Sequence, residues 1–421
     1  MPNNKNKGFT QPSRRDFFGI ASAGIGAALF SGEAEGQEKE SPIKLIPAEK
    51  AALQKGLALI RGCCLSDGAI RMNAGGEPVL INPYFGGHAA LALLAANPHV
   101  TPIEQQTDLY KVAGYLNWYA THQKNTAKEP GYINNHEGTL RTGYKDNGEH
   151  DSVDSYAAMY LMVADRYKQL ADKLPKGSAV KKTLDKILPP ENLEKASKLA
   201  LQAIESVADK EGLTWNIEKI EGKARAKYLM DNIEVKGGLE AGARLFTAIG
   251  AKKEAEKSKE MAAEMAKQLP NYWQKDDGGY SVGKFENDKY GKPKLKKADK
   301  AELYPDGLAN LFALAHIPGA KEDKDKIALW ATLQVEFKKD ALDNAIKRQG
   351  APAAPAGRWL SAAAAVGTDA EIKKWREEVV REMAALKAFD VGVHVPAFSI
   401  LALVEGQRWM EPAAPKIGRE K

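Results

Sequence analysis

The stretch GEHDSVDSYAAMYLMVADRY, residues 148–167, sets two carboxylates against an apolar run. Asp151 and Asp154 stand three residues apart, and Ser155 and Tyr156 follow them directly. A pair of carboxylates can supply an acid and a base, or an acid and a nucleophile. The same residues also suit the start of a helix, where acidic and hydroxyl side chains cap free amides. The stretch alone leaves both roles open for each carboxylate.

Similar side chains precede or begin five other apolar segments, whereas the charged segments between them begin with ordinary Pro, Glu and Lys. The catalytic candidates in this set are Asp154, Asp231, Glu137 and Asp151. The candidates for substrate binding are Tyr84, His88, His136, Tyr156, Asn232, Tyr304, Asp306, Trp359 and His394. Aromatic rings stack on the apolar faces of sugars, and the polar groups hydrogen-bond their hydroxyls. The set therefore predicts a carbohydrate site.

Hydrophobic spacing predicts twelve helices of two alternating kinds. Six carry an apolar stripe opposite a Lys/Glu face, which is typical of helices that cover a core from outside: 48–64, 102–123, 190–209, 251–269, 323–339 and 369–387. Six are apolar nearly all round, which is typical of buried helices: 82–96, 152–170, 229–249, 304–317, 357–366 and 394–406. The chain is therefore predicted to be all-α, with outer and inner helices alternating along it.

The links between the predicted helices also alternate in length. Most links that lead into an inner helix are long, whereas most links that leave one are short. If the helices run alternately up and down, the long links share one rim, and every inner helix begins there. Three long links, 68–85, 131–144 and 278–295, contain glycine turns between strand-like pieces, which predicts small β-hairpins. A ring of six helical hairpins with one loop-rich rim follows.

Several strings within residues 45–410 resemble bacterial members of the six-hairpin glycosidase superfamily, the (α/α)6 toroids. The strings are GAIRMN…VLINPYFGGHAALALL, NWYATHQ…GYINNHEGTLRTGY…DSVDSYAAMYL, YLMDNIEVKGGLEAGARL and YPDGLANLF. The resemblance implies a toroid of about twelve helices, with a sugar-binding cleft and acidic catalytic residues at the N-terminal rim of the inner helices. On matching positions it points to Asp154, Ser155, Tyr156, Asp231, Asn232 and Asp306.

The loop before the fourth helix departs from the pattern of the superfamily. Arg141 and Thr142 stand where the pattern GTIYDY has Tyr and Asp. An acid from this loop would then have to be Glu137 or Asp146.

We therefore expect an exported glycoside hydrolase-like enzyme acting on an oligo- or polysaccharide. Asp154 is expected to be the general acid or base, with Asp231 or Glu137 as its partner. Asp151 is expected to orient or tune the pair.

Two alternatives stay open on the sequence. A polysaccharide lyase needs a base and a group that neutralises a uronate carboxylate; the available side chains are His88, His136, His394, Tyr156 and Arg358. The missing Tyr-Asp in the loop also allows a carbohydrate-binding protein without catalysis. The sequence leaves the sugar, the linkage and the oligomeric state open.

The N-terminal segment has the layout of a twin-arginine signal peptide. Arg14 and Arg15 precede a Gly/Ala-rich apolar stretch that reaches Phe30, and small residues around position 34 suit cleavage. The expected organisation is a signal peptide (1–34), a disordered linker (35–44), one toroid domain (45–410) and a disordered tail (411–421). The expected location is the periplasm or the outside of the cell.

Charge and cysteine content exclude several other classes of function. The 421-residue chain has a formal charge of +6, which falls to +4 without the signal peptide and its four basic and two acidic residues. This mild excess admits a neutral or an anionic carbohydrate partner, and no basic-aromatic pattern indicates nucleic acid. The adjacent Cys63 and Cys64 are expected to be free thiols. We expect no metal, no cofactor and no membrane span after cleavage.

Overall fold

The structure is a computed structural model that describes residues 43–219, 224–286, 289–318, 323–338, 355–387, 392–406 and 408–410. The predicted signal peptide (1–34), nearly all of the predicted linker (35–44) and the predicted tail (411–421) lie outside the described residues.

All twelve predicted helices are present, and the fold is all-α. The outer helices are α2 (Pro47–Cys63), α4 (Pro102–His122), α7 (Pro190–Val207), α9 (Lys252–Gln268), α11 (Lys324–Glu336) and α14 (Asp369–Ala385). The inner helices are α3 (Pro83–Ala95), α5 (Val153–Ala171), α8 (Leu229–Ala248), α10 (Leu308–His316), α13 (Pro355–Val366) and α15 (His394–Glu405). A further helix, α6 (Ala179–Ile187), lies within the link from α5 to α7, which the sequence predicted as a plain loop.

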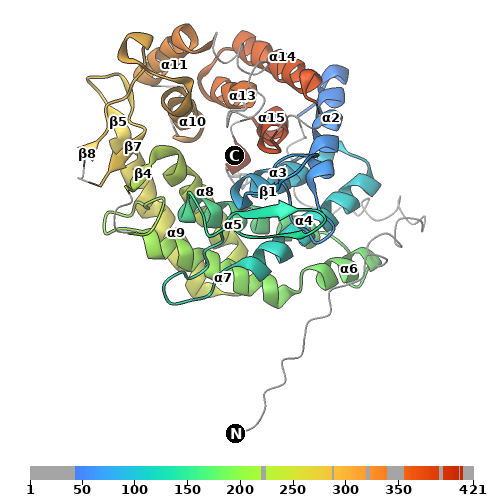
Figure 1. Cartoon of the computed structure of the whole chain (residues 1–421). Coiled ribbons are helices and arrows are strands. Elements are labelled where there is room, and N and C mark those ends of the chain that lie inside the picture. The colour runs from blue at the N-terminus through green and yellow to red at the C-terminus, as the bar shows by residue number, and fades with distance from the viewer. Residues whose placement is uncertain are drawn as a thin grey trace, which may run out of the picture.

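The inner helices form a closed ring, which makes the fold an (α/α)6 toroid. Each inner helix contacts the next one along the chain, from α3 through α5, α8, α10 and α13 to α15, and α15 contacts α3 again. Figure 1 shows these six helices around the centre of the molecule and the outer helices around them. The inner helices are buried on almost every face, as their all-round apolar sequences predict.

Small residues allow the inner helices to approach one another closely. A Cβ atom added to Gly238 on α8 would lie 2.5 Å from the Cα atom of Ala158 on α5. A Cβ atom added to Gly357 on α13 would lie 2.8 Å from the backbone of Phe398 on α15. Larger side chains at these positions would push the helices apart, so the glycines set the width of the ring.

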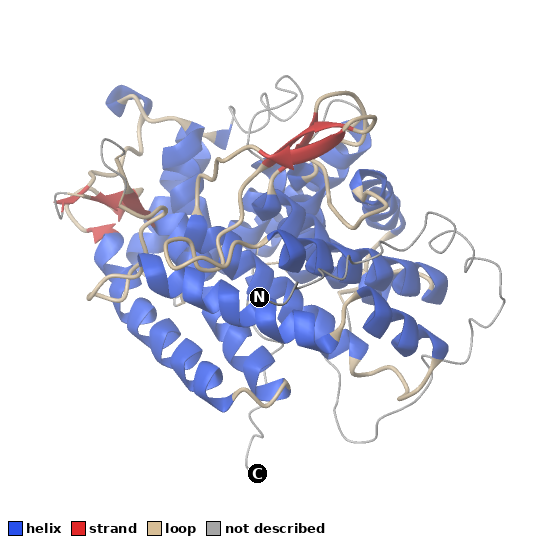
Figure 2. Ribbon diagram, turned by 60° about the horizontal axis from the view of Figure 1, so that its bottom comes forward, coloured by secondary structure: helices blue, strands red, loops and turns tan. Residues whose placement is uncertain are grey.

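Short strands lie within the loops that lead into the inner helices. The first sheet has the order β1-β2-β3, with β1 (Val79–Ile81), β2 (His136–Thr139) and β3 (Gly143–Asp146). The second has the order β4-β7-β8, with β4 (Ala226–Tyr228), β7 (Gly283–Phe285) and β8 (Lys289–Tyr290), and β5 (Trp273–Gln274) pairs with β6 (Gly279–Tyr280). Figure 2 shows both three-stranded sheets toward the same end of the molecule. The predicted loop-rich rim is therefore present.

The predicted hairpins are confirmed in two of the three loops. Strands β2 and β3 form the hairpin predicted for 131–144, and β7 and β8 form the one predicted for 278–295. The hairpin predicted for 68–85 is wrong, because its strand β1 pairs with β2 from the next long loop, with Ile81 opposite His136.

The predicted helix over 304–317 also begins differently, with a π turn (Leu303–Gly307) before α10. Other single turns of 3-10 helix are Asn97–His99, Leu269–Tyr272, Lys297–Asp299 and Arg408–Met410.

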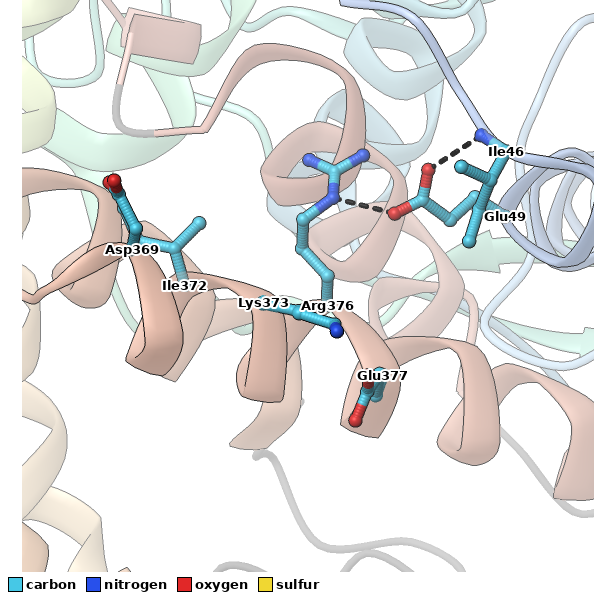
Figure 3. A pocket seen from close by; sticks show the side chains of 7 residues that line it. All are labelled: Ile46, Glu49, Asp369, Ile372, Lys373, Arg376 and Glu377. Atoms are coloured by element: carbon cyan, nitrogen blue, oxygen red, sulfur yellow. Dashed lines mark hydrogen bonds and ion pairs between the residues drawn. The ribbon is translucent and has the colours of Figure 1, made fainter.

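The ring closes where the first outer helix meets the last one. Arg376 on α14 donates from Nε to Glu49 Oε1 on α2 at 2.6 Å, and Glu49 Oε2 accepts from the amide of Ile46 at 2.9 Å. Figure 3 shows this bridge in a shallow surface pocket that Asp369, Ile372, Lys373 and Glu377 also line. The bridge therefore ties the start of the ring to its end.

The two cysteines are free, as expected. Cys63 is buried at the end of α2 and Cys64 is half-buried beside it. Burial raises the pKa of the Cys63 thiol to about 12 and that of the Cys64 thiol to about 11, so both stay protonated at neutral pH. Among the described helices, none is both long and apolar enough to cross a lipid bilayer.

A buried carboxyl group joins the last three helices of the ring. Glu382 on α14 accepts from the amide of Ala356 in α13 at 3.2 Å and from the hydroxyl of Ser399 in α15 at 3.1 Å. Burial raises the pKa of Glu382 from its ordinary value of 4.5 to about 7. The folded protein therefore holds this proton more tightly than the unfolded chain between these two pH values, and stability falls as the pH rises through them.

The substitution Glu382→Gln is expected to remove this pH dependence. The wild-type protein should lose up to about 3 kcal/mol of unfolding free energy from this group between pH 4.5 and pH 8. The Gln variant, which cannot ionise, should become more stable than the wild type at pH 8. Urea unfolding at several pH values measures the difference, and a constant difference between the two proteins would contradict this account.

Candidate active site

The first turns of α5 and α8 carry the centre of the candidate site. Ser152 caps the start of helix α5, and its Oγ accepts from the amide of Ser155 at 3.3 Å. Asp154 follows in its first turn, and Asp231 lies in the first turn of α8. Since α5 and α8 pack closely along their length, their first turns bring the carboxyl groups together. The cap residue is therefore Ser152, and Asp151, which the sequence also allowed as a cap, lies just outside the helix.

Asp154 is fully buried, and both of its carboxylate oxygens are hydrogen-bonded. Oδ1 accepts from Ser152 Oγ at 2.7 Å and from the amide of Ser155 at 2.9 Å, and Oδ2 accepts from Thr214 Oγ1 at 2.7 Å. Thr214 comes from the loop between α7 and α8, which covers the start of α5. Burial raises the pKa of Asp154, although these hydrogen bonds oppose the rise. Asp154 is thus screened from solvent, and Thr214 of this loop contacts it directly.

Asp231 is half-buried and shares Ser152 with Asp154. Its Oδ2 atom lies 3.4 Å from Ser152 Oγ, so one hydroxyl connects the two carboxyl groups. Burial raises the pKa of Asp231 well above its usual range, and the nearby charges of Asp154 and Glu234 raise it further. Asp231 therefore holds a proton at a pH where an ordinary aspartate is ionised.

Asp151 is the exposed carboxylate of the group. The hydroxyl of Tyr156 donates to Asp151 Oδ1, and Asn216 Nδ2 donates to the backbone oxygen of Asp151 at 3.1 Å. The same Tyr156 oxygen lies 2.9 Å from Asn82 Nδ2 and 2.9 Å from Asn135 Oδ1. These contacts hold the carboxylate of Asp151 in place at the surface.

Glu234 belongs to the same cluster, although the sequence did not select it as a catalytic or binding residue. It lies one helical turn after Asp231 and is 1% exposed. Its Oε1 atom accepts from the hydroxyl of Tyr84 at 2.7 Å and lies 3.8 Å from His88 Nε2. Burial raises the pKa of Glu234 to about 7. The sequence could have indicated Glu234 by its position three residues after Asp231, because residues i and i+3 lie on the same face of a helix.

Several predicted binding residues surround this cluster. Tyr84 packs against the rings of His88 at 4.5 Å and Tyr156 at 6.2 Å. Burial lowers the pKa of His88 well below its usual range, so its imidazole is neutral. Tyr304 is 51% exposed at the start of the π turn before α10. These residues place aromatic surface beside the carboxyl groups.

Other predicted residues have structural partners. Asn232 Oδ1 accepts from the amide of Thr214 at 2.9 Å, and its Nδ2 donates to the backbone oxygens of Thr214 and Tyr228. Asp306 is buried and accepts from the amide of Glu302 at 3.1 Å. His394 is buried with its ring 4.5 Å from that of Phe85. In this structure, the Asn232 and Asp306 side chains hold the backbone of the loops and turns at the rim.

Three predicted residues lie apart from the acidic cluster. Trp359 is fully buried and stacks on Trp375 of α14, with ring centroids 4.7 Å apart. His136, the first residue of β2, is buried with its ring 5.1 Å from that of Trp118. Glu137 is exposed on β2, opposite Leu80 and Lys145. The described contacts bring none of the three to Asp154 or Asp231.

Arg358 adds a cation near the buried carboxyl groups. Its guanidinium lies 3.8 Å from the ring centre of Phe398, 4.4 Å from that of Phe312 and 5.7 Å from that of Trp409. Burial lowers the pKa of Arg358, and the neighbouring Tyr84 and Glu234 oppose that change. Within the part of the chain that the structure describes, no group of His, Cys, Asp and Glu side chains has the arrangement of a metal site.

No protein-family model matches the sequence, and no curated protein sequence matches it. Among solved structures, the GH76A α-1,6-mannanase from Salegentibacter sp. HEL1_6 is 10% identical over 86% of this chain and 100% of its own, with a TM-score of 0.50. An inactive variant of that mannanase, with two consecutive aspartates replaced, forms a complex with α-1,6-mannotriose.

A glycosidase in complex with glucose is 13% identical over 88% of this chain and 100% of its own, with a TM-score of 0.53. A rhamnosidase from Klebsiella oxytoca with rhamnose bound is 10% identical over 86% of this chain and 64% of its own, with a TM-score of 0.51. At these identities the likeness is one of fold. The chain therefore shares the helical toroid of these glycoside hydrolases.

Proposed function

We propose that this protein is a glycoside hydrolase-like enzyme that cleaves an oligo- or polysaccharide by carboxylate acid–base catalysis. The observation that carries the proposal is the half-buried Asp231, whose raised pKa keeps it protonated, in one cluster with the exposed Asp151. Glycoside hydrolysis uses two carboxyl groups, one protonated and one ionised. The toroid shared with a mannanase, a glycosidase and a rhamnosidase supports the proposal.

Asp231 is assigned the role of general acid. A general acid must hold its proton near the working pH and must reach the leaving oxygen. The pKa of Asp231 is raised by burial and by its acidic neighbours, and its side chain stays half-exposed. The sequence had favoured Asp154 for this part, but Asp154 is fully buried with both oxygens hydrogen-bonded.

Asp151 is assigned the role of base or nucleophile. It is exposed, and the Tyr156 hydroxyl holds its carboxylate in place. A hydrogen bond from a buried tyrosine fixes the direction of the carboxylate.

Asp154 is assigned a positioning role, because its negative charge helps to keep the proton on Asp231. The substitution Asp154→Asn should lower the pKa of Asp231, so that activity is lost at lower pH than in the wild type. The measurement is the pH profile of kcat/KM, in which the descending limb at high pH should move toward acid. A loss of activity by the same factor at every pH, without a shift of that limb, would contradict this role.

The elimination mechanism has less support from the described geometry. The side chains considered as its base are all buried: His88, His136, His394 and Tyr156.

We also propose export by the twin-arginine route. The support for it is the pair Arg14 and Arg15 and the apolar stretch that follows them. Fractionation of cells that express the Arg14→Lys/Arg15→Lys variant tests it, and unchanged export would count against this route.

A further inference from the structure

A lysine-rich segment follows strand β8 in the long loop that leads into α10. Residues 289–300 contain six lysines and one aspartate. Exposed lysines alternate there with buried residues, in the order Lys292, Pro293, Lys294, Leu295 and Lys296. This alternation is typical of an extended chain, in which successive side chains point to opposite sides. The three lysines therefore stand on one side of the segment, and we call them the lysine row.

Buried contacts hold the segment against the entry of α10. Leu295 is 6% exposed, and a Cβ atom added to Gly279 on β6 would lie 2.6 Å from its Cδ1 atom. The amide of Tyr280, the next residue of β6, donates to Asn310 Oδ1 on α10 at 2.8 Å. Asn310 Nδ2 in turn donates to the backbone oxygen of Asp306 at 2.9 Å, in the π turn before α10. The lysine row therefore has a defined place beside the start of this inner helix.

The lysine row lies on the same rim as the candidate active site. Strands β4, β7 and β8 are neighbours in one sheet, which Figure 1 shows at the edge of the ring. Strand β4 leads directly into α8 and Asp231, and β8 ends two residues before the row. Neighbouring strands lie about 5 Å apart, so β8 lies about 10 Å from β4. The row thus starts close to the strand that positions Asp231.

Two exposed aromatic rings accompany the lysine row. Phe285 on β7 is 43% exposed, and Tyr304 in the π turn is 51% exposed. Gly291, directly before the row, lies against the first ring, because an added Cβ atom would be 2.9 Å from Phe285 Cε2. Exposed aromatic rings can stack on the apolar faces of sugars. The surface therefore combines cations with groups that suit a carbohydrate.

The charges of the lysine row are not neutralised by the part of the chain that the structure describes. Within that part, none of the three lysines forms an ion pair. The lysine-rich stretch 168–186, at the far end of α5, differs because it contains the ion pairs Lys168–Asp172 and Lys181–Asp185. A single exposed lysine needs no partner, but three unpaired ones on one side of a fixed segment repel one another and attract an anionic polymer.

We propose that the lysine row binds the carboxylates of a uronic acid polysaccharide and holds this polymer beside the candidate active site. The inference rests on the proposed function and deepens it, because it names a class of substrate. Lysine ammonium groups can only donate hydrogen bonds, and ionised carboxylates can only accept them. A repeating carboxylate can meet several lysines of the row at once, while sugar rings stack on Phe285 or Tyr304. A neutral polysaccharide would gain nothing from the charges.

The test is binding of polygalacturonate to the full chain, with mannan as the neutral probe and calorimetry as the measurement. Polygalacturonate should bind about tenfold or more tightly than mannan at about 50 mM salt, and this preference should shrink at about 500 mM salt, which screens exposed charges. The triple variant Lys292→Ala/Lys294→Ala/Lys296→Ala should bind polygalacturonate about tenfold or more weakly, because three exposed ion pairs are lost. It should bind mannan as the wild type does.

The matched control is the triple variant Lys173→Ala/Lys176→Ala/Lys182→Ala, which removes three exposed lysines beyond the far end of α5. It lowers the net charge by the same amount and should leave polygalacturonate binding unchanged. Circular dichroism should show both variants folded, since the replaced side chains are exposed. Equal weakening by the two variants would overturn the inference in favour of net charge alone. Unchanged binding by the row variant, no binding of polygalacturonate, or tighter binding of single-stranded DNA would also overturn it.

The outcome is separable from that of the proposed function. Polygalacturonate binding through the lysine row, without cleavage of any polysaccharide, would sustain the row and refute the hydrolase. Cleavage of a neutral polysaccharide without polygalacturonate binding would sustain the hydrolase and refute the row.

Discussion

The substitution Asp231→Asn is expected to lower kcat by about 10²–10⁴-fold, the usual effect of removing a general acid. The amide keeps the shape of the side chain but has no proton of suitable acidity. The variant should stay folded, since it removes a half-buried carboxyl group that lies near the charges of Asp154 and Glu234. Activity against the substrate of the wild type and thermal unfolding of both proteins are the two measurements.

The matched control is Glu382→Gln, which alters a buried carboxyl group of α14 outside the cluster. It should keep wild-type kcat at the pH optimum. Near-wild-type turnover by Asp231→Asn would remove Asp231 from the mechanism. A large fall in melting temperature would instead make its role structural.

The substitution Trp359→Ala is expected to destabilise the protein by about 3–5 kcal/mol, the range for deleting a large buried aromatic side chain. Trp359 is fully buried, its ring stacks on Trp375 at 4.7 Å and an interplanar angle of 15°, and it lies 5.5 Å from Trp330. These three rings join α11, α13 and α14, so the loss of one leaves a cavity between inner and outer helices. Urea unfolding measures the effect.

The variant Trp359→Phe separates packing from sugar binding. A smaller ring should recover part of the lost stability, and sugar affinity of the folded protein should stay close to wild type. If Trp359→Ala kept its stability and lost only sugar affinity, Trp359 would line a binding site, as the sequence had suggested, and the packing role would be wrong.

The helices could be predicted because the distribution of apolar and charged residues along a helix reflects which of its faces are buried. The inner helix PYFGGHAALALLA is apolar all round, whereas the outer helix KKEAEKSKEMAAEMAKQ carries charges on one side. The alternation of these two patterns, and of short with long links, is a property of the ring itself. For this reason the order of inner and outer helices agrees with the structure.

The pairing of strands could not be predicted in the same way. Strand β1 was expected to pair within its own loop, but it pairs with β2 from a loop more than 50 residues later in the chain. Which loops meet at the rim depends on how α3 and α5 sit beside each other. A local turn signal such as Gly75-Gly76 contains no information about that neighbour.

The sequence predicted which carboxyl groups meet at the candidate site, but it did not predict how deeply each of them is buried. The sequence indicated that Asp154 and Asp231 begin inner helices, but not which of them solvent reaches. That difference arises from Thr214, whose loop covers Asp154 and leaves Asp231 half-exposed. Trp359 illustrates the same limit, because a helix that is apolar all round does not reveal which face meets the outer layer.

The mass of the products formed from a panel of neutral and uronate-containing oligosaccharides tests the central claim most directly. Hydrolysis adds one water molecule per cleaved bond, β-elimination adds none, and binding alone leaves every mass unchanged. The account predicts products that have gained water with the wild-type protein and a much lower rate with Asp231→Asn. Unsaturated products without added water, or equal rates for the two proteins, would contradict it.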